Sequence, residues 1–350
     1  MVKRVAFAVP GDLSTPTGGY GYDRRMIAEL RRLGWQVDVL ALGDGFPHPT
    51  AQTKAAARAR LAGAPSGCPI VVDGLAFGVL PEAARDLRAR NPLIALVHHP
   101  LALETGSSLA AARALRDSER LALAATSGII VTSPSTAKLL VDDYGVPAGR
   151  ITVAPPGTDR AAAAAGSRDG IVRLVSVGAA VPRKGFDMLI AALAPLADLP
   201  WRLAIAGDLT RDPVVAAQLK ADIARHRLNG RVDLLGALPQ DRIASVYAGA
   251  DLFVLASRHE GYGMAFAEAM AHGLPVVGTT AGAIPDTVPP QAGLLVAPDD
   301  VAALANALRM LIENPDMRRR LARGAYAAAH ELPRWADSAK LLAGAIEAVA

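Results

Sequence analysis

Cysteine is nearly absent from this sequence, which has a single one, Cys68, in 350 residues. No disulfide can form within the chain, so a disulfide-stapled scaffold is excluded, and the composition suits a reducing, cytoplasmic environment. Aromatic residues are also scarce, at 4%, so we expect cores of closely packed small aliphatic side chains. Because hydrophobic residues make up 51% and charged residues 20%, the composition excludes a disordered chain.

Long hydrophobic runs are missing too. The first residues, "MVKRVAFAVPGDLS", contain only a short apolar run before Pro10 and Asp12, and we expect them to form a first strand, not a signal peptide. The most apolar long window, residues 121–141, is interrupted by Ser, Thr, Pro and Lys. The sequence therefore predicts no transmembrane helix.

The net charge is small, +4, and all of the excess lies in the first half of the chain. Residues 1–165 contain 18 Lys/Arg and 14 Asp/Glu, whereas residues 166–350 contain 19 of each. This excess has two interpretations. It is either a solvated basic face or a surface that attracts an anionic partner, such as the inner face of a membrane on which the protein would be peripheral. Nucleic acid is a poor candidate, because no basic patch is interleaved with aromatic residues.

Short β-branched runs alternate with longer Ala-, Leu- and Arg-rich segments, and this alternation occurs twice. Such strand–helix–strand units predict parallel sheets flanked by helices, and 350 residues exceed the size of one core. We predict two doubly wound α/β domains, at 1–160 and 161–333, with a Pro-, Gly- and Ala-rich linker at 154–170. A last helix, over 334–350, can cross back to the first domain. Ligands of such sheets bind beyond the carboxyl ends of the strands, so we expect the site in a cleft between the domains.

The strands are predicted from their β-branched runs. In the first half these are "RVAFAVP", "QVDVLAL", "PIVVDG", "LIALVHH", "GIIVTS" and "ITVAPPG". In the second half they are "IVRLVSVG", "WRLAIAG", "RVDLLG", "DLFVLAS" and "PVVGT".

The stretch "RHEGYGMAFAEAMAHG" joins a glycine-rich turn to the start of a helix. Glu260 is expected at the ligand-facing tip of the preceding strand, and Glu268 about one turn into the helix, leaning back toward its start. Backbone N–H groups at a helix start attract phosphate or sugar oxygens, and glycine allows close approach. Two carboxylates beside such donors suit a sugar and a ribose. The expected N–H donors are those of Gly261, Tyr262, Gly263 and Met264.

A second charged group follows another predicted strand, in "SVGAAVPRKGFDMLIAAL". Gly178 is expected to make the turn at the end of the strand, and Arg183 and Lys184 precede a helix. Two adjacent cations at this position suit a diphosphate. Ordinary surface charge is the alternative.

The segment "PTGGYGYDRR" is a glycine-rich loop expected between the first strand and the first helix. Gly19-x-Gly21 looks like a dinucleotide-binding fingerprint, but Arg24 occupies the position of the last glycine. A tight turn without a ligand is the alternative interpretation.

Two histidines, His98 and His99, end a predicted central strand. A pair at the carboxyl end of a strand is better evidence of a ligand contact than a lone histidine, and we prefer His98 to His99. Glu104, in the next segment, either meets an acceptor or is a helix-start acid.

The segment "EGYGMAFAEAMAHGLPVV" resembles the signature of the retaining glycosyltransferases of family 4. The resemblance extends over nearly the whole chain and is most specific from Gly178 to Val277. It implies the GT-B fold, with two Rossmann-like domains facing a central cleft. It also implies transfer of a sugar from a nucleotide-diphosphate sugar to an acceptor hydroxyl, for example on a lipid or a polysaccharide precursor. UDP is the expected nucleotide, and GDP and ADP remain open.

The same resemblance implies roles for individual residues. Glu260 would contact the donor sugar and Glu268 the ribose hydroxyls, and Arg183 and Lys184 would neutralise the leaving diphosphate in place of a metal ion. The chain also lacks an Asp-x-Asp triplet, the usual metal site of the other large glycosyltransferase fold, so we expect no metal and no cofactor. The other implied donor contacts are His98, Gly18, Gly19, Asp208, Leu238 and the backbone of Gly261 to Met264; His99 and Glu104 are acceptor-side candidates.

Two alternatives stay open. An NAD(P)-dependent oxidoreductase explains the sheets and the first glycine loop, but not the two glutamates or Arg183 and Lys184. A nucleotide-sugar-binding protein without catalysis would use the same residues, although the complete set of acidic and cationic groups argues against it.

Overall fold

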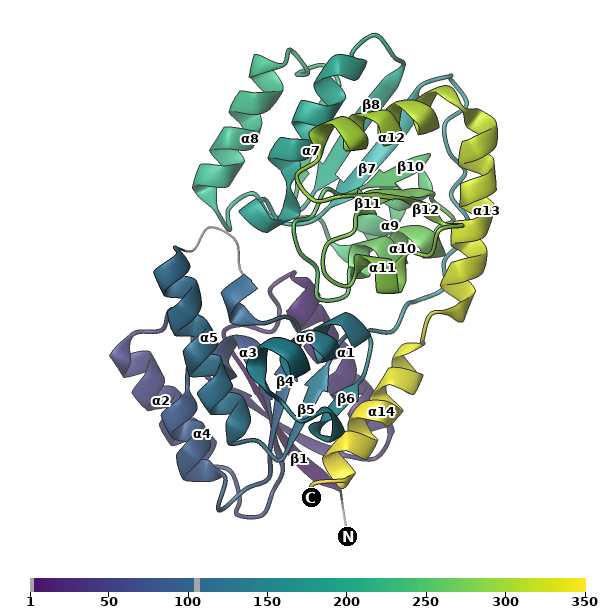
Figure 1. Ribbon diagram of the computed structural model, residues 1–350. Coiled ribbons are helices and arrows are strands. Elements are labelled where there is room, and N and C mark those ends of the chain that lie inside the picture. Colours follow the sequence, from purple (N-terminus) through teal and green to yellow (C-terminus); the bar gives the residue numbers. More distant parts are fainter. Residues whose placement is uncertain (1–2, 104–107) are drawn as a thin grey trace. The chain divides into compact units, whose positions relative to one another are not determined.

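The computed structural model describes residues 3–103 and 108–350, which form two compact units. Unit 1 comprises Met1–Gly157 and Pro333–Ala350, and unit 2 comprises Thr158–Leu332. Each unit is built on a six-stranded parallel sheet flanked by helices (Figure 1). The predicted fold class, two doubly wound parallel-sheet domains, is confirmed.

The sheet of unit 1 has the strand order β2-β1-β3-β4-β5-β6. The chain runs outward from β1 to β2 and then returns to the other side of β1, so its direction switches between β1 and β3. Ligands of such sheets bind at this switch, beyond the carboxyl ends of the strands. The strands are β1 (Arg4–Val9), β2 (Gln36–Ala41), β3 (Ile70–Asp73), β4 (Leu93–Val97), β5 (Gly128–Val131) and β6 (Ile151–Val153). The helices are α1 (Gly18–Arg32), α2 (Ala51–Ala62), α3 (Gly74–Phe77), α4 (Pro81–Leu87), α5 (Leu109–Ala124), α6 (Pro134–Tyr144) and α14 (Trp335–Glu347).

The sheet of unit 2 has the order β12-β11-β10-β7-β8-β9, and its switch falls between β7 and β10. The strands are β7 (Val172–Val177), β8 (Trp201–Ala206), β9 (Val232–Gly236), β10 (Leu252–Val254), β11 (Val276–Thr279) and β12 (Gly293–Val296). The helices are α7 (Phe186–Leu193), α8 (Pro213–Arg225), α9 (Gln240–Ala248), α10 (Met264–Ala271), α11 (Ile284–Thr287), α12 (Val301–Glu313) and α13 (Pro315–Glu331). Short 3₁₀ turns are η1 (Leu101–Leu103), η2 (Ala148–Arg150), η3 (Pro182–Lys184) and η4 (Ala194–Leu196). Every predicted strand is present, and β12 is a strand that the sequence analysis missed.

The strands that carry the sites are buried because helices cover both of their faces. Val71, Ile94 and Phe253 have 0% of their surface exposed. Many of the buried positions are alanines, as the scarcity of aromatic residues predicts. The few large rings concentrate in the cores, where Phe253 packs edge-on against Phe266 with 5.2 Å between the ring centroids.

The predicted linker at 154–170 contains no helix or strand, and the chain passes from unit 1 to unit 2 after Gly157. Its second part is fastened to unit 2, since the N–H groups of Ala164 and Ala165 donate to backbone carbonyls of that unit. At the other end of the chain, α14 packs against α1 within unit 1. The Tyr22 and Trp335 rings make this contact, with 6.1 Å between their centroids.

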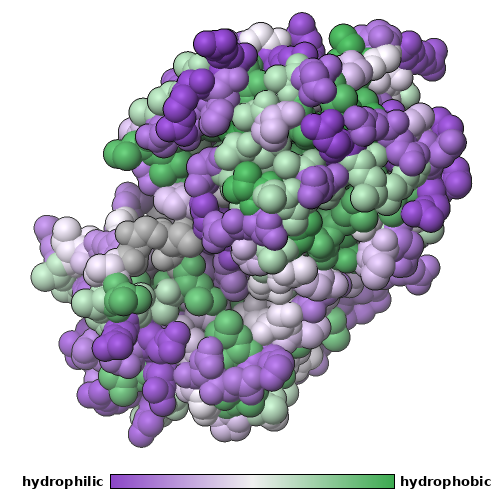
Figure 2. Space-filling view, turned by 45° about the horizontal axis from the view of Figure 1, so that its top comes forward, coloured by the Kyte–Doolittle hydropathy of each residue, from purple (hydrophilic) through white to green (hydrophobic). Residues whose placement is uncertain are grey.

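None of the helices in residues 3–103 and 108–350 has both the length and the hydropathy that a bilayer-spanning segment requires. On the face shown in Figure 2, hydrophilic residues cover much of the surface and hydrophobic residues form smaller groups among them.

The docking of α14 on unit 1 predicts a contrast between two neighbouring leucines. Leu342 is 0% exposed in this helix, whereas Leu341 is 46% exposed. Leu342→Ala should lower the free energy of unfolding by about 2–5 kcal/mol, and Leu341→Ala should change it by less than about 0.5 kcal/mol. Urea unfolding followed by circular dichroism measures both. Equal losses for the two variants would show that α14 does not contribute a buried face.

Candidate functional site

The residues predicted for the donor site lie just beyond the carboxyl ends of unit 2 strands. Gly178 follows β7, Asp208 follows β8, Leu238 follows β9 and Glu260 follows β10. Because β7 and β10 are neighbours in the sheet, the segments after these two strands meet at the switch point.

Glu260 lies between the two predicted cations. Lys184 Nζ donates to its Oε1 at 2.6 Å, and Arg183 Nη1 donates to its Oε2 at 3.2 Å. Ser257 Oγ adds a third hydrogen bond to Oε1, at 2.6 Å. Arg183 Nη1 also donates to the carbonyl oxygen of His259, at 2.8 Å. The structure thus brings Arg183, Lys184 and Glu260 into one group.

The charges of this group explain why a carboxylate can be buried there. Only 8% of the Glu260 side chain is exposed. Burial by itself would raise the pKa of Glu260, but the charges of Lys184 and Arg183, with the hydrogen bonds from Lys184 and Ser257, lower it to about 2. Glu260 is therefore ionised at neutral pH, and the group of two cations and one anion carries a net positive charge.

Arg258, which the sequence analysis did not single out, holds the Arg183–Lys184 turn in place. Its guanidinium forms a bidentate pair with Asp187, at 2.9 and 2.8 Å, and donates to the Pro182 carbonyl at 2.8 Å. The Arg258 N–H donates to the Arg183 carbonyl, also at 2.8 Å. The side chain and backbone of one residue thereby hold the first two residues of η3. In the sequence, the only signs of this contact were an arginine two positions before Glu260 and an aspartate after the Arg–Lys pair.

Gly178 lies against the aliphatic part of Lys184. A Cβ at position 178 would lie 3.2 Å from Lys184 Cε and 3.3 Å from Cδ. Any larger residue would push the Lys184 stem, and a shift of a few tenths of an ångström would lengthen the short bond to Glu260. The glycine at the end of β7 therefore leaves room for the lysine stem.

Glu268 is on α10, which begins at Met264 after an N-cap glycine, Gly263, with φ of +91°. The Tyr247 hydroxyl donates to Glu268 Oε2 at 3.3 Å. Burial raises the pKa of Glu268 to about 7, despite the hydrogen bond from Tyr247, which lowers it. Glu260 and Glu268 thus have opposite electrostatic surroundings. Glu260 is held ionised, whereas the pKa of Glu268 is close to neutral pH.

Three other donor-site predictions fall on turns of unit 2. Asp208 uses Oδ1 to accept the N–H and the hydroxyl of Thr210, each at 2.7 Å, and these bonds lower its pKa. Leu238 lies in the turn between β9 and α9. Tyr262 is buried, and its carbonyl accepts the Thr287 hydroxyl at 2.7 Å, which fixes the backbone of the loop next to Gly261.

In unit 1 the predicted glycine loop is shorter than expected. Gly18 and Gly19 are the first residues of α1 and not part of a loop, because Thr17 caps the helix by accepting the Tyr20 N–H. The helix start passes close to a predicted histidine, since a Cβ at position 19 would lie 3.3 Å from His98 Cδ2.

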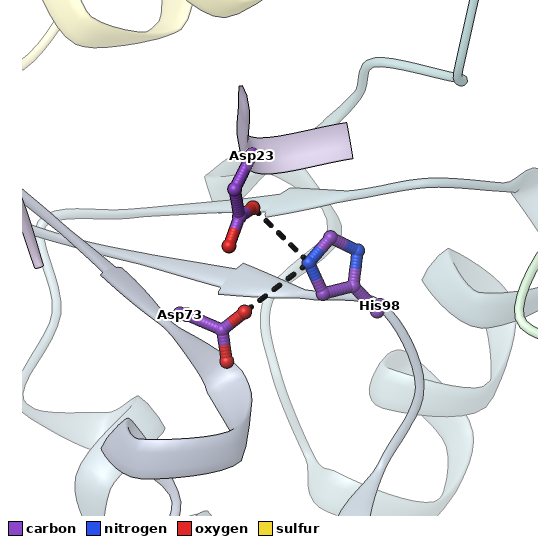
Figure 3. Close-up of side chains that lie close together, drawn as sticks. All are labelled: Asp23, Asp73 and His98. Atoms are coloured by element: carbon purple, nitrogen blue, oxygen red, sulfur yellow. Dashed lines mark ion pairs between the residues drawn. The ribbon is translucent and has the colours of Figure 1, made fainter. Parts of the chain in front are cut away.

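His98 lies between two buried carboxylates that the sequence analysis missed (Figure 3). Its Nε2 is 3.3 Å from Asp23 Oδ1 and 3.3 Å from Asp73 Oδ2. Asp23 comes from α1, Asp73 ends β3, and His98 follows β4. Asp23 and Asp73 are 0% and 3% exposed. The signal for Asp73 was available, because it is an acid at the carboxyl end of a predicted strand.

The three ligand atoms of this cluster lie within 4.8 Å of one another, a spacing that a metal ion could also bridge. The cluster can balance its charge without one. Burial would lower the pKa of His98, but the carboxyl groups of Asp23 and Asp73 beside Nε2 raise it to about 10. Burial, and then the charge of Asp73, raise the pKa of Asp23 to about 7. A protonated ring, with Asp23 partly protonated at neutral pH, leaves the group with little net charge.

The two acceptor-side candidates are less informative. His99 is half-buried beside His98. Glu104 lies outside the described residues.

Two family models match the chain. "Glycosyl transferases group 1" matches residues 159–328, and "Glycosyltransferase Family 4" matches residues 69–162. An MMP alpha-(1->4)-mannosyltransferase of Mycolicibacterium hassiacum is 30% identical over 83% of this chain and 73% of its own length. A D-inositol 3-phosphate glycosyltransferase of Nocardia farcinica is 32% identical over 63% of this chain and 52% of its own length. The chain thus spans about half to three quarters of these two curated relatives.

Solved structures share the fold at lower identity. Sucrose-phosphate synthase from Thermosynechococcus elongatus has a TM-score of 0.82, with 20% identity and 99% of both chains covered. Anabaena HepE in complex with UDP-glucose has a TM-score of 0.77, with 20% identity, covering 98% of this chain and 99% of that chain.

The raised pKa of Glu268 predicts how stability depends on pH. The folded protein holds this proton up to about pH 7, whereas an unfolded glutamate releases it near 4.5. The Glu268 contribution to stability is therefore present at low pH and is lost as the pH rises between these values. Glu268→Gln should flatten the decline in melting temperature over this range, and the exposed control Glu331→Gln should not. Identical pH slopes for wild type and Glu268→Gln would refute the assignment.

Proposed function

Since this chain belongs to the glycosyltransferases of group 1 and family 4, we propose that it is a retaining enzyme that transfers a sugar from a nucleotide-diphosphate sugar to an acceptor hydroxyl. The family makes it an enzyme of the hexosyltransferase type, and its two Rossmann-like units are those of the GT-B fold. The retaining course, the donor and the acceptor are the parts that we propose.

The observation that carries the proposal is the group formed by Arg183, Lys184 and Glu260. It is positively charged, nearly buried and located at the switch point of the unit 2 sheet. A diphosphate placed there would meet two cations whose positions are already fixed by Glu260 and Arg258, so little reorganisation is needed when negative charge develops on the leaving group. This neutralisation by side chains is why we propose transfer without a metal ion.

The glutamates take complementary parts in this proposal. Glu260 is ionised, and its oxygens can accept hydrogen bonds from sugar hydroxyls while it keeps the two cations in place. Glu268 would accept the ribose hydroxyls, and nucleotide binding would favour its ionised form. Departure of the diphosphate leaves an oxocarbenium-like sugar, and the leaving phosphate is a candidate base for the acceptor proton.

A UDP-sugar is the donor that we propose, with GDP- and ADP-sugars as alternatives. The HepE structure that shares the fold was solved with UDP-glucose. One curated relative, 35% identical over 44% of this chain, is a GDP-mannose-dependent mannosyltransferase acting on an acylated phosphatidylinositol mannoside. These names support a nucleotide sugar and a hydroxyl acceptor, on a lipid or a polysaccharide precursor.

We predict that Glu260→Gln and Lys184→Gln each lower kcat/KM for sugar transfer by about 10²–10³-fold, because each removes a preorganised charge. Lys220→Gln, at an exposed position of α8, is the matched control and should keep wild-type activity. Product NMR should show the donor's anomeric configuration retained. Full activity in folded Glu260→Gln and Lys184→Gln would refute the proposal.

A thermal-shift screen separates the alternatives, since a ligand that binds the folded state raises the melting temperature. UDP-, GDP- and ADP-sugars and NADH are compared on the wild-type chain. Stabilisation by NADH alone would favour an oxidoreductase. Stabilisation by a nucleotide sugar, with no transfer and no donor hydrolysis, would favour a binding protein without catalysis.

We also propose that unit 1 meets an anionic membrane surface from the cytoplasmic side. Helix α4 contacts both α2 and α5. These three helices and the residues at their ends expose more basic than acidic side chains. Leu109 and Leu121 of α5 are 84% and 57% exposed among these charges. Basic side chains with exposed apolar neighbours suit a lipid interface. The exposed basic residues are Lys54, Arg58, Arg60, Arg85, Arg88, Arg90, Arg113 and Arg120.

Vesicle flotation tests this surface. Wild-type protein should float with anionic vesicles and not with zwitterionic ones. The double variant Arg113→Gln/Arg120→Gln should bind about thirtyfold less, at about 1 kcal/mol for each arginine. Arg320→Gln/Arg323→Gln, on the exposed side of α13, is the control. Equal recovery with both lipids would rule out the membrane surface.

A further inference from the structure

We propose that Asp23 and Asp73 are positioning residues that keep His98 as an imidazolium, so that His98 serves as a cationic hydrogen-bond donor to a substrate oxygen and not as a base. The part played in transfer rests on the proposed function. The state of the ring does not, because it follows from unit 1 alone.

Two carboxyl groups surround one nitrogen of the His98 ring, and this arrangement favours the protonated ring. Asp23 and Asp73 both approach Nε2, each at 3.3 Å, from two different elements of the fold. Both carboxyl groups are almost completely buried. Two buried acids without a cation would be costly, and the single N–H that Nε2 can carry cannot compensate both of them. A protonated ring supplies the charge that the site needs.

The second support is the fixed orientation of the ring. The Gly19 backbone lies against the Cδ2–Nε2 edge, and the Tyr22 ring packs edge-on, with 5.3 Å between the ring centroids and an angle of 79°. The Thr132 hydroxyl donates to the His98 carbonyl at 3.2 Å. The Gly19 and Tyr22 contacts restrict rotation of the ring, and the Thr132 bond holds the backbone that carries it. The other ring nitrogen, Nδ1, lies on the side of the ring away from both acids (Figure 3).

The groups that face the ring are consistent with this charge. From α1 come Asp23 and Tyr22, and from the end of β3 comes Asp73. Tyr22 is neutral, because burial raises its pKa well above the ordinary value, and its hydroxyl donates to the Ala154 carbonyl. The pKa of His98, about 10, agrees with a ring that stays protonated throughout the neutral range.

A locked imidazolium has a defined chemical consequence. Because Nε2 faces the acids, Nδ1–H is the donor left for a ligand, and 19% of the His98 side chain is exposed. It can donate to a hydroxyl or phosphate oxygen of a substrate, where a charged donor gives a stronger hydrogen bond than a neutral one. It cannot take the acceptor proton, because both nitrogens already carry protons.

The test is an NMR titration of the full chain labelled with ¹³C and ¹⁵N in histidine. The seven histidines give seven Cε1 signals, and the one missing in His98→Gln is that of His98. In wild type this signal should remain that of an imidazolium at pH 8. Asp73→Asn and Asp23→Asn should each lower the pKa of His98 by about 1–3. Asp86→Asn, a surface acid paired with Arg58, is the control and should leave it unchanged.

Asp73→Asn is the safer variant, because an asparagine at position 73 can still accept the Leu75 N–H that caps α3. Transfer by this variant should be lost as the pH rises through the lowered pKa of His98 and should recover at lower pH, whereas wild type stays active. A structural defect alone would not be reversed by acid.

Three results would overturn the inference. The first is a wild-type His98 that titrates near the ordinary 6.5, and the second is a signal that neither asparagine variant shifts. The third is one equivalent of a divalent ion in the purified protein whose chelation moves the His98 signal, which would make the cluster a metal site. A failure of the proposed function is seen separately, as absence of sugar transfer, and leaves the titration valid.

Discussion

The ion group of Glu260 with Lys184 and Arg183 is the interaction on which the rest of the candidate donor site depends. A buried carboxylate is unfavourable unless cations and hydrogen bonds compensate for its lost hydration. Here two cations and the Ser257 hydroxyl do so. The same contacts hold the cations in place. Removing the carboxylate would leave two nearly buried positive groups that repel each other.

The packing around this group restricts the positions of its two cations. Arg258 fastens the turn that carries Arg183, and Gly178 leaves room for the Lys184 stem. Neither contact touches the carboxylate directly. Both limit where the ammonium and guanidinium groups can lie, and a site that neutralises developing charge works best when its groups do not need to reorganise.

The two units use opposite arrangements of charge at equivalent places in their sheets. In unit 2, one acid lies between two cations beyond β7 and β10. In unit 1, one histidine lies between two acids near β1, β3 and β4. Both places are at or next to the switch points of the sheets, where the following loops and helices diverge. In both, burial makes the charge of the central group depend on its two partners.

Much of the fold could be predicted from the sequence, because parallel strands that are buried on both faces have continuous apolar sequences. β12 was missed, since "GLLV" is short and half-exposed at the edge of its sheet. The glycines at 18 and 19 were assigned to a loop because glycine is a poor helix former, but the Thr17 cap draws them into α1.

The sequence by itself determined that Glu260, Arg183, Lys184 and His98 are unusual: each is a charged or titratable residue just after an apolar strand. Only the tertiary structure decided which partners they have. Asp23 and Arg258 are distant in the chain from His98 and Pro182, and no local pattern records such contacts. Spacing along a strand fixes which end a residue occupies, but pairing across a sheet depends on strand order, which is settled when the whole core packs.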